Sequence, residues 1–428
     1  MAFVLLVHLG LLWIYWRPEP KTLLGDEGMY RRWADDLSAG REPEPDLLWP
    51  PLYPRFLALV LGSPQASVLR VQIVQTALLV LVAFVLRDLT RRLTGRPLAA
   101  DAAAWLVLAY PPLVAFAHYL WPEVLHLALF LSALWVLLAR RESLAWMPVA
   151  GVLLGLALLT KSLLGPFLPA LLLPIVTQGP WPRRLARVGL VLAALFATTA
   201  PTLLANRSLS GRFVVADSSL FNLWVGLNDR SRKSLVDEVV ADEYTAFQKS
   251  ASTFAERNQV LRARIAAFVH DRGVLPILKA QLGRQYFRLF DKDSYLTDQL
   301  PDGPMGRMGA GYRGASRAAI VTIRGLSYVV YALVLVGGAL GLALCPPRGR
   351  LGLWIVLAFL AYNLGIFLLL HVKSRYQIQF LPFVFLYAGC AWDWMRNRDA
   401  AAPSRFAWSL SLAGAALLLF LAFGAGGP

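Results

Sequence analysis

Acidic and basic side chains lie at the ends of several long apolar runs, where they could serve chemistry. Asp26 and Glu27 follow the first run, Glu123 opens the fourth, and Lys161 ends the fifth. Carboxylates beside several cations suit a site in which an acid group takes a proton from a hydroxyl while the cations hold an anion. A further group stands between two late runs and consists of His371, Lys373, Arg375 and Tyr376.

Each of these charges also has a simpler explanation. Asp26 and Glu27 could cap the start of a helix, and Glu123, which follows a proline, could do the same. Lys161 could extend to the lipid headgroups, and the late cations could bind lipid phosphates. His118 alone is typical of a hydrogen-bonded interfacial histidine. We favour a functional site because the four charged groups fall on one side of the predicted membrane.

The stretch that begins at Asp26 has the pattern of an amphipathic helix. Apolar residues recur at positions 29, 33 and 37, with charged residues between them. This pattern predicts a helix on the membrane surface with its apolar face down. Glu27 is offset from Asp26 by about 100° around such a helix, and it can face Arg31 at i+4.

The composition places the chain among polytopic membrane proteins. Hydrophobic residues make up 57% of the sequence, and the mean hydropathy is +0.54. These values exclude an ordinary soluble protein. The net charge of +16 does not indicate nucleic-acid binding here, because short cytoplasmic loops of membrane proteins collect Lys and Arg. Cys345 and Cys390, the only cysteines, lie in or beside apolar runs, so no disulfide framework is expected.

Apolar runs of about 17–25 residues predict eleven membrane-spanning helices. They lie near residues 2–16, 68–86, 100–118, 122–139, 145–160, 162–178, 188–205, 318–344, 351–370, 377–395 and 406–424. The first run has no basic start and no small-residue cleavage site, so we expect a retained anchor rather than a signal peptide. If the spans alternate, the basic loops share one face, which the positive-inside rule makes cytoplasmic together with the N-terminus. These loops contain Arg87, Arg91, Arg92, Arg96, Arg140, Arg141, Arg183, Arg184, Arg187, Arg348, Arg350, Arg396, Arg398 and Arg405.

Two long connections remain on the outer face. The first outer loop, residues 17–67, carries Asp26. The second connection has mixed charge and helical character, which predicts helices on or above the membrane rather than a sheet domain. We therefore expect three units: an N-terminal transmembrane module (1–205), an outer segment (206–317) and C-terminal transmembrane helices (318–428).

Several of these stretches, in their order along the chain, resemble the GT-C glycosyltransferases, in particular the branch of protein O-mannosyltransferases and lipid A aminoarabinose transferases. The Asp-Glu pair lies just ahead of Tyr30, and Trp49-Pro50-Pro51-Leu52-Tyr53-Pro54 follows it in the same outer loop. Gly151 and Gly155, a pair typical of close helix packing, begin a run that ends in Thr160-Lys161. The other matches are Asn222-Leu223-Trp224-x-Gly226-Leu227-Asn228, and Arg375-Tyr376 before a span containing Pro382. The resemblance covers essentially the whole chain.

The resemblance implies an all-α polytopic membrane protein with the GT-C fold. Arg greatly outnumbers Lys, and Ala and Leu dominate, which favours a bacterial protein and hence a bacterial inner membrane. The resemblance also implies an enzyme that transfers a sugar from a polyprenyl-phosphate donor to a glycan, lipid or protein acceptor on the periplasmic face. Carried over by position, Asp26 would be the catalytic acid residue that takes the proton of the acceptor hydroxyl, and Lys161 and Arg375 would lie near the donor phosphate. We further expect Glu27 as a second catalytic residue and Lys373 and Tyr376 at the donor phosphate. The expected substrate contacts are Tyr30, Tyr53, Arg55, His118, Glu123 and His371.

Two departures concern the aminoarabinose branch. Where that branch has Arg three residues after its Asp, this chain has Met29, and where it has Lys before Pro-Pro-Leu, this chain has Trp49. Both departures remove expected phosphate contacts, so that particular substrate is not carried over.

Metal use and one rival function stay open. A divalent metal could find ligands among the acids and histidines, but no fixed-spacing metal motif is present. No other cofactor is expected. The alternative function is a membrane transporter or lipid flippase whose boundary charges line the path. Such proteins tend to have inverted repeats and charges near the bilayer midplane, and the sequence has no evident repeat. The candidate metal ligands are Asp26, Glu27, His118, Glu123 and His371.

Overall fold

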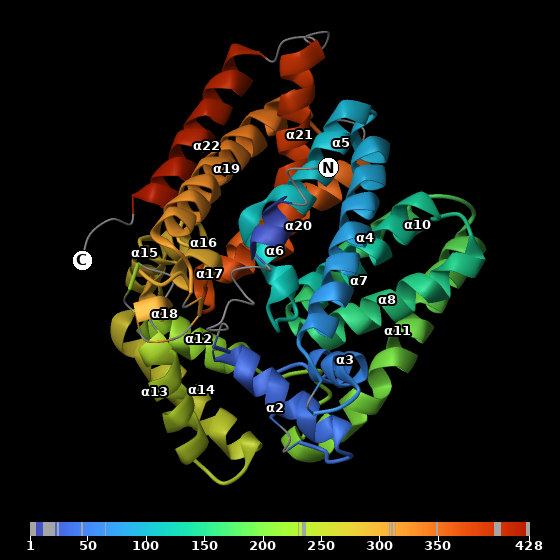
Figure 1. The fold of residues 1–428 in the computed structure, drawn as a ribbon. Helices are drawn as coiled ribbons and strands as arrows, with labels where there is room; N and C mark the ends of the chain where they lie inside the picture. The colour runs from blue at the N-terminus through green and yellow to red at the C-terminus, as the bar shows by residue number, and fades with distance from the viewer. Residues whose placement is uncertain are drawn as a thin grey trace.

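The computed structural model describes residues 6–11, 22–23, 25–43, 46–64, 66–229, 231–232, 237–307, 309, 311–312, 314–347, 350–397 and 404–424. Within these ranges the chain is helical nearly throughout, with no strand and only an isolated bridge between Thr22 and Gly311. The expected all-α fold is confirmed. In Figure 1 the yellow-green helices of residues 237–272 lie together at the lower left, below the orange and red helices of the C-terminal part.

The helices are grouped by the three units expected from the sequence, and that division stays a prediction. The N-terminal unit contains α2 (Asp26–Ser38), α3 (Leu52–Leu61), α4 (Leu69–Thr94), α5 (Pro97–Ala109), α6 (Pro111–His118), α7 (Glu123–Ala139), η1 (Leu144–Trp146), α8 (Met147–Thr160), η2 (Ser162–Phe167), α9 (Leu168–Leu171), α10 (Leu173–Val176) and α11 (Trp181–Ser210). The outer segment contains α12 (Ser219–Asn228), α13 (Asp237–Lys249), α14 (Phe254–Arg272), α15 (Val274–Leu282), α16 (Gln285–Leu289), α17 (Tyr295–Asp298) and α18 (Pro304–Arg307). The C-terminal unit contains α19 (Arg317–Leu344), α20 (Leu351–Leu369), η3 (Ser374–Gln379), α21 (Leu381–Asn397) and α22 (Arg405–Phe423).

Five described helices are long and apolar enough to cross a membrane, namely α4, α11, α19, α20 and α22. Helices α5 and α6 form a sixth candidate span that is bent by 51°. The bend falls at Tyr110, before Pro111, whose ring and missing N–H interrupt helical hydrogen bonding. The predicted number of eleven spans is therefore not confirmed.

The remaining apolar runs form shorter or interrupted elements. The runs 122–139 and 145–160 correspond to α7 and α8, while prolines divide the run 162–178 into η2, α9 and α10. Most of the first run, 2–16, lies outside the described residues, and residues 6–11 of it are helical.

Helix α8 packs closely against α11 through the two glycines. A side chain at Gly151 would overlap the backbone oxygen of Val191, and one at Gly155 would overlap the side chain of Thr198. The predicted role of this pair in close helix packing is confirmed.

Basic residues from distant parts of the chain meet at one end of the helices. Arg96 Nη1 lies 3.6 Å from Asp393 Oδ2, which joins the turn between α4 and α5 to α21. Arg350 Nη1 donates to the backbone oxygens of Leu93 and Thr94 at 3.2 and 2.9 Å. These contacts agree with the sorting of the basic loops to one face. That this face is cytoplasmic stays a prediction.

Candidate active site

Asp26 is the first residue of α2, and its side chain leaves the helix to make a tertiary contact. The N-cap position is Gly25, whose φ of 48° favours glycine, and no side-chain cap hydrogen bond is made there. Arg375 Nη2 instead donates to Asp26 Oδ2 at 2.5 Å. The Asp26 carboxylate is therefore paired with a cation from a distant part of the sequence, and it does not cap α2.

Arg375 belongs to η3, between α20 and α21, and its guanidinium lies among aromatic rings. Its central carbon is 4.7 Å from the ring centroid of Trp121, 5.3 Å from that of Tyr295 and 5.6 Å from that of Tyr376. Ring faces attract a desolvated guanidinium, so these rings fix its position as the ion pair does. The Nε of Arg375 is buried and has no hydrogen-bond partner among the described residues.

Several cations act on the Asp26 carboxyl. Burial raises its pKa, but the charge of Arg375, with smaller contributions from Lys373 and Lys161, outweighs burial and holds the pKa below its ordinary value. Asp26 is therefore an ionised carboxylate at neutral pH.

Glu123 and Lys161 form a second ion pair beside the first. Glu123 is the first residue of α7, Lys161 follows the last residue of α8, and Lys161 Nζ donates to Glu123 Oε1 at 2.9 Å. The side chains are 2% and 15% exposed, respectively, so neither reaches freely into solvent or headgroups. Lys161 Nζ also lies 5.9 Å from the ring centroid of Tyr376, the ring that Arg375 approaches at 5.6 Å. The snorkelling explanation of Lys161 does not describe this geometry.

Glu27 lies on the buried side of α2. Its side chain is fully buried, and its Oε1 accepts a hydrogen bond of 3.1 Å from the Leu120 backbone N–H. The expectation that Glu27 faces Arg31 is wrong, because Arg31 Nε donates to Asp35 Oδ1 at 2.9 Å instead. Glu27 therefore ties α2 to the turn before α7, and a catalytic role for it stays a prediction.

Tyr30 and Tyr53, the two tyrosines of the first outer loop, pack against each other. The Tyr30 and Tyr53 rings meet edge to face with centroids 5.1 Å apart. Burial and then the negative charge of Asp26 raise the pKa of Tyr30, which places this residue within the electrostatic reach of the site. The Tyr53 hydroxyl donates to Gln75 Oε1 at 3.0 Å.

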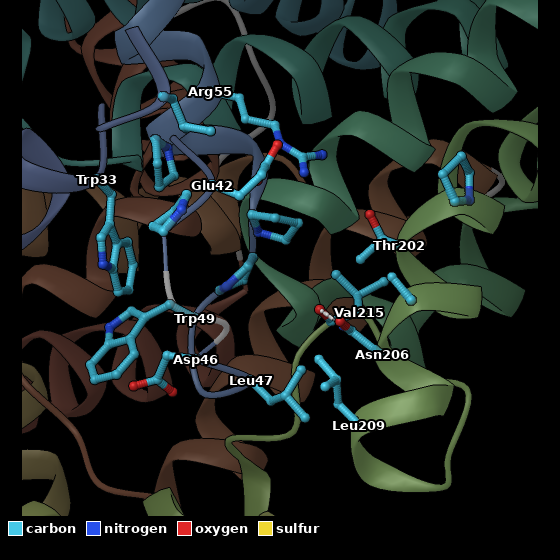
Figure 2. Close-up of a pocket in the computed structure, with 17 residues that line it drawn as sticks. Trp33, Glu42, Asp46, Leu47, Trp49, Arg55, Thr202, Asn206, Leu209 and Val215 are labelled. Atoms are coloured by element: carbon cyan, nitrogen blue, oxygen red, sulfur yellow. Dashed lines mark hydrogen bonds between the residues drawn. The ribbon is translucent and has the colours of Figure 1, made fainter. Parts of the chain in front are cut away.

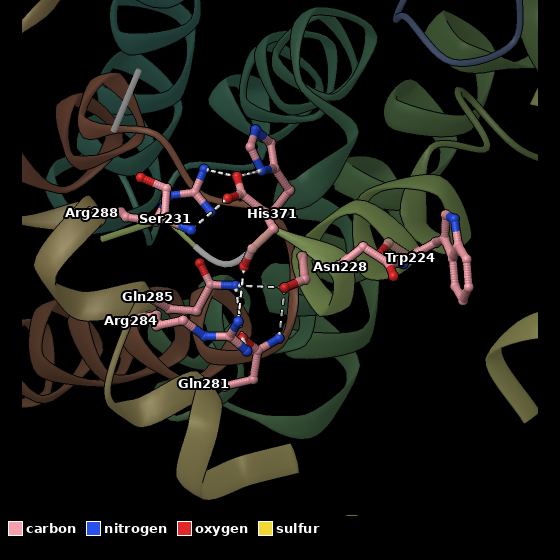
Figure 3. Close-up of polar contacts among 10 residues, drawn as sticks. Trp224, Asn228, Ser231, Gln281, Arg284, Gln285, Arg288 and His371 are labelled. Atoms are coloured by element: carbon pink, nitrogen blue, oxygen red, sulfur yellow. Dashed lines mark hydrogen bonds and ion pairs between the residues drawn. The ribbon is translucent and has the colours of Figure 1, made fainter. Parts of the chain in front are cut away.

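His371 contacts a buried ion pair that the sequence did not reveal. Asp229, which follows α12, pairs with Arg288 of α16, and both side chains are almost completely buried. His371 Nδ1 lies 3.8 Å from Asp229 Oδ2. Figure 3 shows Arg288 and His371 converging from different elements. Burial, followed by the charges of Arg288, Lys373 and Arg375, lowers the pKa of His371 well below its ordinary value, so the imidazole is neutral.

Asp229 directly follows the segment 222–228, which supported the family resemblance. This adjacency was the one feature of the sequence that could have marked Asp229 as a functional residue. No feature of the sequence marked Arg288, because basic residues are common in a long segment outside the membrane.

His118 and Arg55, two of the predicted substrate-binding residues, make none of the contacts with Asp26, Arg375 or Lys161 described above. The His118 ring is buried against the ring of His8, with centroids 5.6 Å apart. Arg55 is exposed and lines a groove of about 290 Å³ between the first outer loop and α11. Figure 2 shows Trp33 and Trp49 on one side of this groove and Thr202 across from them.

Among the described residues, no group of three or more His, Cys, Asp or Glu side chains is placed to hold a metal ion. The acids of the site are instead paired with cations or buried against backbone. The possibility of a divalent metal, left open by the sequence, therefore stays an untested expectation.

The geometry brings the carboxylates of Asp26 and Glu123 together with three cations, at the first residues of α2 and α7, just after α8, and at residues 373–375. Asp26 has Arg375 as a direct partner, with Lys373 and Lys161 within electrostatic range. Such an arrangement can hold an anion on the cations while the carboxylate accepts a proton. It brings together charges that lie as far apart in the sequence as Asp26 and Arg375, and their roles stay predictions. It also assigns Trp121 and Tyr295, which the sequence analysis had not selected, to the walls of that location.

Comparison with known proteins agrees with this reading of the sequence. Residues 49–204 match the family described as dolichyl-phosphate-mannose-protein mannosyltransferase. No curated protein sequence matches the chain.

Two solved structures are similar to it. The archaeal oligosaccharyltransferase AglB from Archaeoglobus fulgidus, solved with an inhibitory peptide and a dolichol-phosphate, has a TM-score of 0.51 and 13% sequence identity. The similarity covers 99% of this chain and 54% of AglB, so the chain spans about half the length of that protein. Apo ArnT from Cupriavidus metallidurans shares 18% identity over 96% of this chain and 76% of its own, with a TM-score of 0.38.

The match over residues 49–204 includes the helices that present Glu123 and Lys161. The likeness to AglB extends over nearly all of the chain and concerns its fold. The chain therefore matches that mannosyltransferase family over residues 49–204, and its polytopic helical fold is similar to that of AglB.

Proposed function

We propose that the protein is a membrane glycosyltransferase that moves a sugar from a polyprenyl-phosphate donor to an acceptor hydroxyl on the extracytoplasmic face. The observation that carries the proposal is the Asp26–Arg375 contact of 2.5 Å within a group of further cations. The solved structure of AglB contains a dolichol-phosphate, a lipid of the class that the proposal requires as leaving group.

The proposed chemistry divides the work between the acid and the cations. A lipid phosphate leaves readily, so the step needs a base for the acceptor hydroxyl and positive charge for the departing phosphate, but no general acid. Asp26 accepts the hydroxyl proton as the acceptor oxygen attacks the anomeric carbon. Lys161, Lys373 and Arg375 hold the phosphate, with Arg375 best suited to two parallel contacts. Direct displacement inverts the configuration at the anomeric carbon.

Donor binding also prepares the base in this scheme. In the structure the strongest opposing charge on Asp26 is that of Arg375, and the Arg375 Nε has no hydrogen-bond partner among the described residues. A phosphate that binds Arg375 takes up part of that positive charge. The pKa of Asp26 then rises, and its carboxylate becomes a better proton acceptor when the donor is in place.

The acceptor lies along α2 in our proposal. Trp33 stands seven residues after Asp26, which puts it on the same face about 10 Å further along the helix. It lines the groove that also contains Arg55. An acceptor hydroxyl at Asp26 can therefore belong to a molecule whose remaining part occupies the groove, whether that acceptor is a glycan, a lipid or a protein.

The test is a transfer assay with the purified full chain in lipid nanodiscs. A panel of undecaprenyl-phosphate sugars is offered together with glycan, lipid and peptide acceptors that carry free hydroxyls, and the release of undecaprenyl phosphate is measured together with the anomeric configuration of the product. We expect release with at least one donor, an inverted product, and loss of both with Asp26→Asn. Release that is unchanged in Asp26→Asn contradicts the role of the base. Absence of release from every donor, with intact folding, contradicts the proposed donor class.

A further inference from the structure

The short helix α12 contacts the chain segment that leads from α20 into η3, backbone against backbone. A methyl group added to Gly226 would lie 2.7 Å from the His371 nitrogen and 2.8 Å from the Leu369 oxygen, so only glycine fits there. The His371 backbone N–H donates to the Asn222 oxygen at 2.7 Å. This close approach fixes the start of the segment that carries the site cations, which we call the cation loop (residues 371–376).

A buried pair of charges reinforces the same contact. Asp229, one residue beyond α12, pairs with Arg288 and lies 3.8 Å from His371 Nδ1. Ions are costly to bury, and they persist only where the partner geometry is maintained. The pair therefore joins α12, α16 and the cation loop at one point.

The end of α12 is in turn held by amide side chains of the outer segment. Gln281 Nε2 and Gln285 Nε2 donate to the Gly226 oxygen at 3.0 and 3.3 Å, and Arg284 Nη1 donates to the Asp229 oxygen at 3.1 Å. Figure 3 shows these side chains reaching α12 from one side while His371 approaches it from another. Helix α12 is thus fixed on both sides.

Lys373 and Arg375 follow His371 by two and four residues. Four residues of fully extended chain span about 14 Å, so Arg375 cannot lie further than this from His371. The position of the cations relative to Asp26 depends on how well that start is held. If the cation loop is already ordered before the phosphate binds, binding does not cost the entropy of ordering it. The affinity for the phosphate is therefore higher.

We infer that α12, with Asn222, Gly226 and Asp229, is the positioning element of the cation loop and sets the affinity of the site for a lipid phosphate. These residues act through the backbone and ring of His371, so they are positioning residues and not catalytic ones. The inference rests on the proposed function for the identity of the phosphate. It extends that function to a part of the outer segment whose role was unassigned.

The experiment compares Gly226→Ala with Gly365→Ala. Gly365 lies on α20 a few residues before the cation loop, where an added methyl group meets nothing within 4 Å, so it controls for the substitution itself. Two quantities are measured in nanodiscs: amide hydrogen exchange in residues 370–376, and the dissociation constant for undecaprenyl phosphate. We expect Gly226→Ala to speed exchange at least tenfold and to weaken binding about tenfold, and Gly365→Ala to leave both within about twofold of wild type.

A second variant, Asp229→Asn, keeps the shape of the side chain and removes its charge. We expect it to raise the donor KM several-fold while kcat changes by less than about threefold, because Asp26 remains in place. A general loss of folding would lower kcat and the amount of active protein and leave KM unchanged.

The outcomes separate this inference from the proposed function. If exchange and phosphate binding in Gly226→Ala equal those of Gly365→Ala, the positioning role of α12 is wrong. If exchange is faster in Gly226→Ala but wild type binds no undecaprenyl phosphate, the positioning role stands and the proposed donor falls.

Discussion

Asp26 and Arg375 are 349 positions apart in the chain, and their side chains meet at 2.5 Å. The contact joins the first helix of the outer loop to the segment before α21, so the candidate base and the candidate phosphate ligand are each other's partner. In the protein without donor each ion neutralises the other. Under the proposed function, a bound phosphate competes for the same guanidinium, and the first three predictions follow from this competition.

The first prediction separates catalysis by Asp26 from a structural role. Asp26→Asn keeps the size of the side chain and its ability to accept a hydrogen bond from Arg375. We expect normal folding and transfer reduced by about 10²–10⁴-fold, the usual scale for loss of a general base. Asp36→Asn is the control, because Asp36 lies on the same helix and pairs with Arg41. Transfer within about threefold of wild type for Asp26→Asn would return the residue to a structural role.

The second prediction concerns pH. Burial raises the Asp26 pKa, but Arg375 and then Lys373 and Lys161 hold it below the ordinary value of about 3.9. The stabilisation from ionised Asp26 is therefore fully present above that ordinary value, and it is lost as pH falls through the lower folded pKa. We expect the acid limb of kcat/KM that belongs to Asp26 to lie below about pH 4 and to move upward in Arg375→Ala. An acid limb that is the same in both proteins would argue against this electrostatic coupling.

The third prediction tests phosphate binding by Arg375. Arg375→Ala removes a charge-assisted contact worth about 1.5–3 kcal/mol, so donor affinity or rate should fall about 10- to 150-fold. Arg375→Lys should recover only part of this loss, because an ammonium group lacks the planar fork of guanidinium. Arg324→Ala is the matched control, since Arg324 forms an ion pair with Asp302 away from the site. Equal kinetics for Arg375→Ala and wild type would leave Arg375 as a residue that binds bulk lipid.

The fourth prediction distinguishes stability from function in the Glu123–Lys161 pair. Glu123→Gln leaves a mostly buried ammonium group without its counter-charge, and we expect a loss of about 1–3 kcal/mol in stability. The double variant Glu123→Gln with Lys161→Met removes both charges and should regain most of that stability. Its transfer activity should stay low, because a phosphate ligand is gone. Thermal unfolding and the transfer assay measure the two effects, and full activity in the double variant would exclude Lys161 from the site.

The fifth prediction concerns the orientation in the membrane. Cysteines introduced at Arg92 and Arg184 should react with impermeant reagents only from the cytoplasmic side, and a cysteine at Arg264 only from outside. Arg264 lies on α14 of the outer segment. Labelling of the Arg264 site from the cytoplasm would invert the proposed face of the enzyme.

The site was partly predictable from sequence because charges at a membrane boundary are exceptional. Asp26, Glu123, Lys161 and Arg375 could be selected for that reason, and they do lie together. Asp229 and Arg288 could not be selected, since charged residues are ordinary in an outer segment and only tertiary packing buries this pair.

The limits of the fold prediction have equally specific causes. Glu27 can face Arg31 in an isolated helix, but contact of α2 with the Leu120 turn turns the carboxylate inward. The number of spans was uncertain for another reason. The apolar composition shows how long each hydrophobic run is, but it does not show whether the run forms one straight helix. Pro111 and the prolines of the 162–178 run determine where the helices bend or break.

The distance in sequence between Asp26 and Arg375 has a consequence for how the protein is made. A ribosome that adds about 5–20 residues per second needs roughly 20–70 s to travel from one residue to the other. During that interval the part of the chain that carries Asp26 enters the membrane while its carboxylate lacks the partner cation. A segment synthesised much later supplies that charge, so under the proposed function a nascent chain is inactive on a lipid-linked sugar until Arg375 has been added and packed into place.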